Sequence, residues 1–431
     1  MHQSKFEASL SNIIGAAPSR AALAISGGSD SIALLYLATN WAKREKVQLV
    51  VMHVDHNLRA SSTQDAKFVQ EIAHYLGHEF HLLRWQRSDD ITSAVQEKAR
   101  EVRYDMMTMK CLELGVQLLM TAHHFDDMIE NYLMRKSRGS GVLGLSYSHS
   151  YFVNDIHIVR PLLAFKKESL QNYLHQNQYS WVEDETNISD KYERNRVRKE
   201  WNRLSDQAQQ AIVDDMQRVN QEAQILNQQL ICFLAEFVQI DRMGFCIVQM
   251  AEYKNLQYDL QIQVLSYLLT IASGKAILPR FRNVQPIIEK IKQNIALDCT
   301  LHGCLLVSMD GTQLLICREK SQISVDFYPL VDNVRWDNRF EITAKITNHN
   351  YKVTALSQEA YSSIKDKIDM SCIVQAPKIY ARLILFTLPV IEHLEKMIAI
   401  PHISYYDEKI LENNLQIIFK PNFVSRFTHF L

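Results

Sequence analysis

Near the N-terminus, a short segment rich in glycine and serine has the residue types of a phosphate-binding loop. It consists of Ser26, Gly27, Gly28, Ser29, Asp30 and Ser31, and it lies between an apolar stretch and a stretch with helical periodicity. Glycines let the backbone come close to a ligand, serine hydroxyls donate hydrogen bonds, and free N–H groups at a helix N-terminus attract phosphate. A serine-capped helix after a tight turn is the alternative interpretation. The place of all six residues between a strand and a helix favours an anion site, although the segment matches neither the P-loop pattern nor the dinucleotide fingerprint.

A second group of polar residues follows a later apolar stretch, at 116–122. The adjacent carboxylates of Asp126 and Asp127 open a segment with helical pattern. Carboxylates in such a place can hold Mg²⁺ that bridges phosphate groups, or can bind an ammonium group. Helix capping is the competing interpretation, because acidic residues stabilise helix N-termini. A zinc site built on His123 and His124 is not expected, because adjacent residues of an extended strand point to opposite faces.

The elements that position these residues alternate between apolar, strand-like runs and amphipathic helical stretches. Strands are predicted at 21–26, 48–54, 80–85 and 116–122, and helices from residue 30, at 68–76 and at 92–114. This βαβαβαβ order predicts an α/β fold, with a parallel sheet and helices on its faces. Right-handed crossovers bring the carboxyl ends of such strands to one edge, where ligands bind. We therefore expect the loop and the two aspartates to meet at that edge.

The length of the chain predicts more than one domain, since its 431 residues exceed the size at which a single core stops growing, about 250 to 300 residues. A Gln-rich helical pattern begins near 205, a hairpin turning at Asp310-Gly311 is predicted within 300–317, and a mixed, β-branched composition follows from 325. We expect a parallel-sheet domain at 1–205, a helical linker with a small domain at 206–322, and an α+β C-terminal domain at 323–431.

Composition bounds the class of protein. The overall charge gives no sign of a polyanionic partner, because 47 basic and 48 acidic residues nearly cancel. Positive charge is concentrated at 135–138 and, most densely, at 191–203, and a solvated helix face is the alternative interpretation of either cluster. Seven scattered cysteines show no C-x-x-C pair and no zinc spacing, which fits reduced thiols in a cytoplasmic protein. We find neither a secretory signal pattern nor a run of about 18 apolar residues, so no membrane association is expected.

The loop at 26–31 resembles the S-G-G-x-D-S signature of the N-type ATP pyrophosphatases, the PP-loop superfamily. That resemblance implies that ATP is cut between its α and β phosphates. Further blocks resemble the lysidine synthase family within this superfamily. They are H-V-D-H-x-L-R at 53–59, E-x-A-R-x-x-R-Y at 97–104, A-H-H-x-D-D-Q-x-E-T at 122–131, R-G-[ST]-G-x-x-G-[LM] at 138–145, R-P-L-L at 160–163, D-x-[ST]-N at 184–187 and R-N-x-[IV]-R at 194–198. Met128 and Asn131 replace the Gln and Thr of the third block, and both aspartates remain.

This resemblance is tight over residues 20–200 and weak beyond, at 301–304 and 317–319. It implies ATP and Mg²⁺ as cofactors, and L-lysine and tRNA(Ile) with a CAU anticodon as substrates. For the three expected domains, it implies catalysis, substrate binding and tRNA binding in turn. ATP would adenylate the C2 oxygen of the wobble cytidine, and lysine would displace AMP to give lysidine, which changes codon reading from AUG to AUA. The implied ATP-binding residues are Ser26 to Ser31, His53 and Asp55, with Asp30 and Asp127 as Mg²⁺ ligands. The implied catalytic residues are Asp30, Arg100, Asp126 and Asp127, and the implied contacts to lysine or tRNA are His123, Arg103, Arg138, Arg194 and Arg198.

Two other functions share parts of this pattern. A tRNA thiolase or another PP-loop synthetase has the same ATP loop, but thiolation usually requires paired cysteines near the site, and Cys111 is the only cysteine before Cys232. A catalytically silent RNA-binding protein is disfavoured, because Asp30, both adjacent aspartates and the loop glycines are present. The sequence is compatible with a homodimer but does not determine the oligomeric state.

Overall fold

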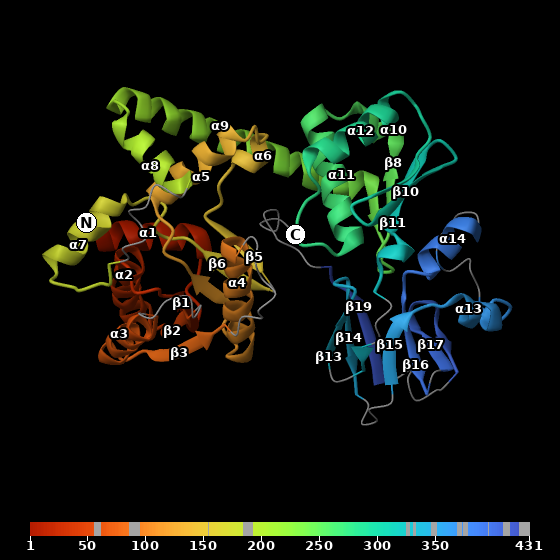
Figure 1. Ribbon diagram of the computed structural model, residues 1–431, viewed down its shortest axis with the longest axis horizontal. Coiled ribbons are helices and arrows are strands. Elements are labelled where there is room, and N and C mark those ends of the chain that lie inside the picture. The colour runs from red at the N-terminus through yellow and green to blue at the C-terminus, as the bar shows by residue number, and fades with distance from the viewer. Residues whose placement is uncertain are drawn as a thin grey trace. The chain divides into compact units, whose positions relative to one another are not determined.

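The computed structural model describes residues 1–55, 62–85, 95–153, 155–183, 193–324, 328–330, 333–345, 351–368, 373, 378–394, 396–407 and 414–421. The chain divides into two compact units, the first built from Met1–Ile225 and the second from Leu226–Val424 (Figure 1). Across these described residues, no helix combines the length and the apolar character needed to cross a membrane. The six cysteines that the structure describes are all free thiols.

A six-stranded sheet forms the centre of the first unit (Figure 1). In the sheet order β3-β2-β1-β4-β6-β5, its strands are β3 (Glu79–Arg84), β2 (Gln48–Asp55), β1 (Arg20–Ala24), β4 (Leu118–Met120), β6 (Ile156–Val159) and β5 (Ser150–Val153). Every neighbouring pair is parallel except β5 and β6, which are antiparallel. The predicted α/β fold with a parallel sheet is therefore confirmed.

Helices cover both faces of this sheet. They are α1 (His2–Ile14), α2 (Ser29–Glu45), α3 (Ser62–Tyr75), α4 (Val95–Glu113) and α7 (Lys167–Gln176). Three more helices, α5 (Phe125–Ser137), α6 (Val142–Leu145) and α8 (Glu193–Arg203), pack together in a separate apolar cluster. Successive strand residues point to opposite faces, so Leu23 and Val51 pack with residues of α1, α2 and α7, whereas Ala22 and Val50 pack with residues of α4. Because β1 and β2 are covered on both faces, they are continuous apolar runs, which made them recognisable in the sequence.

Helix α1 and the β5–β6 hairpin of the first unit were not predicted from the sequence, and neither was the short helix α6. Helix α1 precedes the sheet and buries Phe6 and Leu10 in the core. The β5–β6 hairpin adds the antiparallel edge, and Phe152 stacks on His157 across it at 4.5 Å between ring centroids. The hairpin ends at the carboxyl edge of the sheet, so it borders the region where the functional residues gather.

The long helix α9 (Asp206–Phe237) begins in the first unit and ends in the second, as the predicted connecting helix does. An antiparallel sheet follows, with the strands β7 (Val238–Ile240), β8 (Cys246–Gln249), β11 (Gln313–Arg318), β10 (Cys304–Met309) and β9 (Asp298–Leu301) in that order. Helices α10 (Met250–Asn255), α11 (Tyr258–Ser273) and α12 (Phe281–Lys292) accompany it. The predicted hairpin is confirmed as β10–β11, and Asp310 and Gly311 have the positive φ angles that its tight turn requires.

The rest of the second unit contains two more antiparallel sheets. One has the order β12 (Tyr328–Pro329), β15 (Tyr351–Ala355), β16 (Pro389–His393), β17 (Lys396–Ile400) and β18 (Tyr405–Tyr406), and the other has β13 (Asn333–Trp336), β14 (Phe340–Ala344) and β19 (Leu415–Phe419). The helices are η2 (Lys320–Gln322), α13 (Gln358–Ile364), α14 (Lys378–Leu385) and η4 (Pro401–Ile403). One apolar core joins residues on both sides of 322, from Phe245 and Leu315 to Trp336 and Ile391. The domain boundaries near 205 and 322 stay predictions.

Two arginines share one carboxylate inside this second unit. Arg318 donates to Asp337 through Nε at 2.9 Å and Nη2 at 2.8 Å, and the Nε of Arg339, a residue with no exposed surface, donates to the same carboxylate at 2.6 Å. Nearby glycines leave the space that the two side chains fill. A Cβ atom added at Gly274 would lie 2.6 Å from Arg339 Cγ, and one added at Gly303 would lie 2.7 Å from Arg318 Nη1.

Candidate active site

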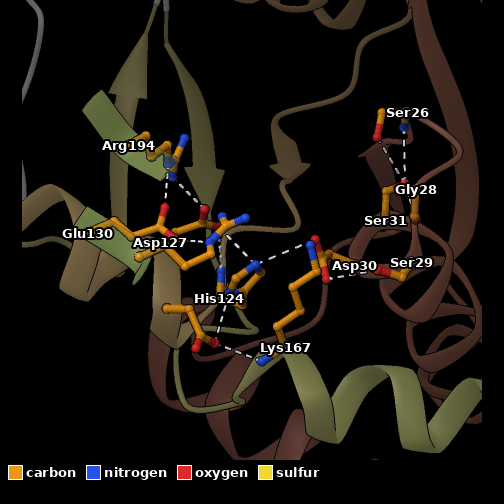
Figure 2. A network of polar contacts seen from close by, with 12 residues as sticks. Ser26, Gly28, Ser29, Asp30, Ser31, His124, Asp127, Glu130, Lys167 and Arg194 are labelled. Atoms are coloured by element: carbon orange, nitrogen blue, oxygen red, sulfur yellow. Dashed lines mark hydrogen bonds and ion pairs between the residues drawn. The ribbon is translucent and has the colours of Figure 1, made fainter. Parts of the chain in front are cut away.

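The loop between β1 and α2 is closed by hydrogen bonds to one serine hydroxyl (Figure 2). Ser31 Oγ accepts from the backbone N–H groups of Ser26 at 3.2 Å and Gly27 at 3.1 Å, and it donates to the carbonyl of Gly28 at 2.9 Å. Gly27 has a φ of +98°, which a residue with a side chain rarely adopts, and its carbonyl accepts from the N–H of Val182 at 2.9 Å. The loop is thus fixed in shape, and the first turn of α2 presents its N–H groups beside it.

His124, at the N-terminus of α5, lies among three carboxylates and is almost completely buried. Its Nε2 atom is 3.4 Å from Asp30 Oδ2 and 3.5 Å from Asp127 Oδ2, and its Nδ1 atom is 3.3 Å from Asp126 Oδ2 (Figure 2). Burial by itself lowers the pKa of His124, but hydrogen bonds and charge from these carboxylates outweigh it and raise the pKa to about 10. The imidazole is therefore protonated at neutral pH and holds the ends of α2 and α5 together.

The same contacts act on the carboxylates. Burial raises the pKa of Asp30, yet the hydrogen bond and the charge of His124, followed by the charge of Lys167, bring it below its ordinary value. Partial burial likewise raises the pKa of Asp126, but His124 together with the backbone N–H of Lys167, which donates to Asp126 Oδ2 at 2.7 Å, brings this pKa below its ordinary value. Asp127 Oδ2 accepts from the backbone N–H of His124 at 3.1 Å. Each of the adjacent aspartates therefore satisfies a helix N-terminus in addition to facing the histidine, Asp126 that of α7 and Asp127 that of α5.

One turn further along α5, Glu130 is 2% exposed and connects α5 to α8. Arg194 donates from Nε to Glu130 Oε2 and from Nη2 to Asp127 Oδ1, both at 2.5 Å (Figure 2). Arg198 donates from Nε to Glu130 Oε1 at 2.6 Å. Burial lowers the pKa of Arg194, but the charges of Asp127 and Glu130 raise it above its usual value. The two arginines thus fix α8 against the acidic end of α5.

The other predicted site residues lie around this centre or outside the described part of the chain. His53 Nδ1 bonds to the carbonyl of Ile25 at 2.9 Å, and burial lowers its pKa, so it is neutral at the end of β2. Asp55 is buried at the same strand end. His123 Nδ1 bonds to Thr121 Oγ1 at 3.0 Å, whereas His124 faces the carboxylates.

Three predicted arginines lie on α4 or just after α5. Arg103 is half-buried on α4, and Arg138 forms an ion pair with Glu193. The side chain of Arg100 and the block at 184–187 lie outside the described residues.

With this geometry in view, comparison with known proteins places the chain. Residues 2–204 match the family model described as the PP-loop domain. The whole chain is similar to the tRNA(Ile)-lysidine synthase of Rickettsia felis, with 41% identity over 429 residues and 99% coverage of both chains. The chain belongs to the tRNA(Ile)-lysidine synthase family. The corresponding protein of Rickettsia typhi is 40% identical over 434 residues, again with 99% of both chains covered. Among solved structures, a U34-tRNA thiolase from Methanococcus maripaludis aligns with a TM-score of 0.44 and 17% identity over 51% of this chain and 77% of that one.

Membership of the lysidine synthase family confirms the resemblance found in the sequence. That resemblance also implies a Mg²⁺ ion bound together with ATP. Among the residues that the structure describes, no group of three or more His, Cys, Asp or Glu side chains is arranged to hold a metal ion. Asp30 and Asp127 nevertheless both face His124 Nε2 from the PP-loop side and the α5 side. Mg²⁺ is usually bound by one or two carboxylates together with substrate phosphates, so two carboxylates suit that mode, and the assignment of Asp30 and Asp127 as its ligands stays a prediction.

Two residues that organise the site received no role from the sequence. His124 was indistinguishable from its neighbour His123, because only the fold decides which of them faces the acids. Glu130 was part of a family block, and the signal that would have found it is its spacing: Asp127 and Glu130 are three residues apart on α5, and Arg194 and Arg198 are four apart on α8. Both spacings place side chains on one helix face.

Proposed function

We propose that this protein ligates L-lysine to C2 of the wobble cytidine in the CAU anticodon of tRNA(Ile). ATP is consumed through an adenylated cytidine, and the products are lysidine, AMP and diphosphate. The observation that carries the proposal is the meeting of the PP-loop, through Asp30, with the acidic N-terminus of α5 at a single histidine. An ATP-activating loop and a carboxylate group suited to a cationic amine are what a lysine ligation needs at one place. Full-length similarity to enzymes named tRNA(Ile)-lysidine synthase supports the same substrate choice.

ATP would bind with its phosphates against Ser26 to Ser31 and the N-terminus of α2, whose N–H groups and dipole favour negative charge. Its base would lie toward the end of β2, where His53 and Asp55 are buried. Asp30 and Asp127 would hold Mg²⁺, which supplies charge neutralisation to the phosphates when it is bound. The cytidine oxygen attacks the α-phosphorus, and the bond to the β-phosphate breaks so that diphosphate leaves with the electron pair.

Lysine then has to arrive with its ε-amine as a nucleophile. The lowered pKa of Asp126 suits it to hold the ammonium group of lysine, and one of the two adjacent aspartates, Asp126 or Asp127, would accept the proton of the amine. The neutral amine attacks C2, the bond from C2 to the adenylated oxygen breaks, and AMP leaves. Holding both substrates in line lowers the activation free energy by about 7 kcal/mol in well-oriented reactions. His124, fixed between the two helices, keeps these carboxylates at constant positions through the cycle.

The second unit and the basic segments would select the tRNA. We propose that residues beyond the PP-loop domain contact the body of the tRNA and distinguish it from a methionine tRNA that carries the same anticodon. Arg103, Arg138 and His123 stay predicted contacts to lysine or RNA, and the contacts predicted for Arg194 and Arg198 would have to be made alongside their bonds to Glu130.

The direct test combines purified protein, ATP, radiolabelled lysine and tRNA(Ile) transcripts with the CAU anticodon. We expect ATP-dependent label in the RNA, and no label when ATP is omitted or when the anticodon cytidine is replaced by uridine. A folded protein that transfers no lysine to the cognate transcript would contradict the proposal. Incorporation of labelled sulfur in a parallel reaction would instead identify a thiolase.

A further inference from the structure

Helix α8 presents two faces with different partners. Residues one turn or two turns apart share a face, and Arg194, Arg198 and Trp201 satisfy this spacing. The arginines bond to Glu130 and Asp127, and Trp201 is 7% exposed in an apolar cluster with Ile129 and Tyr132 of α5. This inner face therefore attaches α8 to the acidic side of the active site.

The opposite face of α8 carries a second set of cations. Arg196 is two positions from Arg194, which places it about 200° around the helix, and Lys199 and Arg203 follow it at spacings of three and seven residues. All three residues are exposed, and two acidic residues lie on the same side, Glu200 and Glu193, of which Glu193 forms an ion pair with Arg138. Along the axis, Arg196 and Arg203 are about 10 Å apart. The outer face is thus a short positive stripe on a chain whose net charge is −1.

The distance of this stripe from the active site indicates what it can bind. The inner face touches Asp127, and Asp127 lies within 3.5 Å of the histidine that contacts Asp30 of the PP-loop. A helix with its side chains is about 10 to 12 Å across, so the outer face lies roughly that far from the acidic cluster. A nucleobase delivered to the cluster is covalently joined to sugars and phosphates on both sides. Those phosphates have to pass close to α8.

We propose that the outer face of α8, through Arg196, Lys199 and Arg203, binds the sugar–phosphate backbone next to the target nucleotide. The proposal rests on the proposed function in taking RNA as the substrate. It divides the basic run at 191–203 into two roles: Arg194 and Arg198 fix the helix to the site, and the outer cations hold the RNA. Exposed arginines that contact phosphates add affinity without reading bases, so this face sets how tightly RNA is held and leaves the choice of sequence to other contacts.

The test is the salt dependence of tRNA binding by the full-length protein. The double variant Arg196→Ala/Arg203→Ala removes two cations from the stripe, and Lys43→Ala/Lys67→Ala removes two exposed cations from α2 and α3 as a matched control. We expect the first variant to bind tRNA(Ile) on the order of tenfold more weakly near physiological salt, and the slope of log affinity against log salt to fall by about 2. A non-cognate tRNA should lose affinity by the same factor. The control should match the unmodified protein in both quantities.

Each outcome decides between the two proposals. An unchanged slope and affinity in the Arg196→Ala/Arg203→Ala variant, with an unchanged melting temperature, would overturn the assignment of this face. So would an equal loss in the control, because that would show a general effect of net charge. If the unmodified protein transfers no lysine but the stripe variant still loses tRNA affinity and slope, the proposed function fails while the RNA surface stands. If the unmodified protein transfers lysine but the stripe variant keeps its salt slope and its tRNA affinity, the proposed function stands and the assignment of the RNA surface fails.

Discussion

Replacing Glu130 by glutamine tests whether the acidic end of α5 depends on α8. The substitution Glu130→Gln keeps the shape of the side chain and removes its charge. The amide of glutamine has one acceptor oxygen, so it can accept from Arg194 or from Arg198 but not from both, and Arg194 keeps only Asp127 as an acidic partner. We expect a less stable first unit and a lower rate of lysine transfer, because α8 is no longer fixed against the site.

The size of the stability loss follows from the burial of the partners. Removing one member of a fully buried ion pair costs about 3 to 5 kcal/mol, because the other charge stays without compensation. Glu130 is buried, but the side chains of Arg194 and Arg198 are 39% and 30% exposed, so water can solvate the charges that are left. We therefore expect about 1 to 2 kcal/mol, between the value for a buried pair and that for a surface pair. For a unit of this size, that corresponds to a fall in melting temperature of roughly 3 to 6 °C.

Scanning calorimetry and the lysine-transfer assay measure the two effects together. Glu113→Gln is the matched control, since Glu113 pairs with Lys110 on exposed surface of α4 and its loss should cost less than about 0.5 kcal/mol. In Glu130→Gln, we expect transfer to fall by about tenfold or more, because small displacements of reacting groups are costly. A melting temperature and a transfer rate equal to those of the control would refute the idea that α8 supports the site through this carboxylate.

Three further changes give results that the structure defines in advance. Asp30→Ala should reduce pyrophosphate release with ATP and tRNA by about 100-fold or more; near-normal release would remove this residue from the ATP site. Gly27→Ala should lower the unfolding free energy of the first unit by about 1 to 3 kcal/mol, because φ is +98° there, whereas Gly28→Ala, with a φ of −71° and 3.9 Å to the nearest atom, should leave that free energy nearly unchanged. Equal melting temperatures of the two variants would contradict this. Burial, with the charges of nearby arginines, lowers the pKa of His402 to about 4, so the unfolded chain takes up a proton below its pKa of about 6.5 while the folded chain does not. Unfolding free energy should therefore fall by about 2 kcal/mol between pH 7 and pH 5, and urea titrations of His402→Gln should show a correspondingly smaller change.

The sequence predicted the parts of the fold that depend on local pattern. Strands β1 and β2 are buried on both faces, so they are unbroken apolar runs, and the glycines and serines after β1 have few other uses at a strand-to-helix turn. The β5–β6 hairpin escaped prediction because each strand has four residues and mixes aromatic and polar side chains. Such a short edge is stabilised by its neighbour in the sheet rather than by its own periodicity.

The sequence predicted which acidic residues form the candidate site, but not which side chains contact them. Asp30, Asp126 and Asp127 do gather at one edge, as strand order required. Which of two adjacent histidines turns toward them depends on the exact end of β4, and no local pattern encodes that. The spacing of Arg194 and Arg198 suits two phosphates as well as it suits one buried carboxylate. Glu130 is 64 residues from Arg194 in the chain, so their contact exists only once the helices have packed.

The two buried arginines of the second unit restrict which amino-acid substitutions this unit can accept during evolution. Arg318 and Arg339 depend on the single carboxylate of Asp337, and the absent side chains of Gly274 and Gly303 supply the room for them. A substitution at one of these five positions either leaves a buried charge without its partner or places a methyl group in a volume that is already filled. Compensation therefore requires simultaneous substitutions at positions far apart in the sequence. Their joint presence would therefore mark the second unit in remote homologues whose nucleotide-loop residues have diverged beyond recognition.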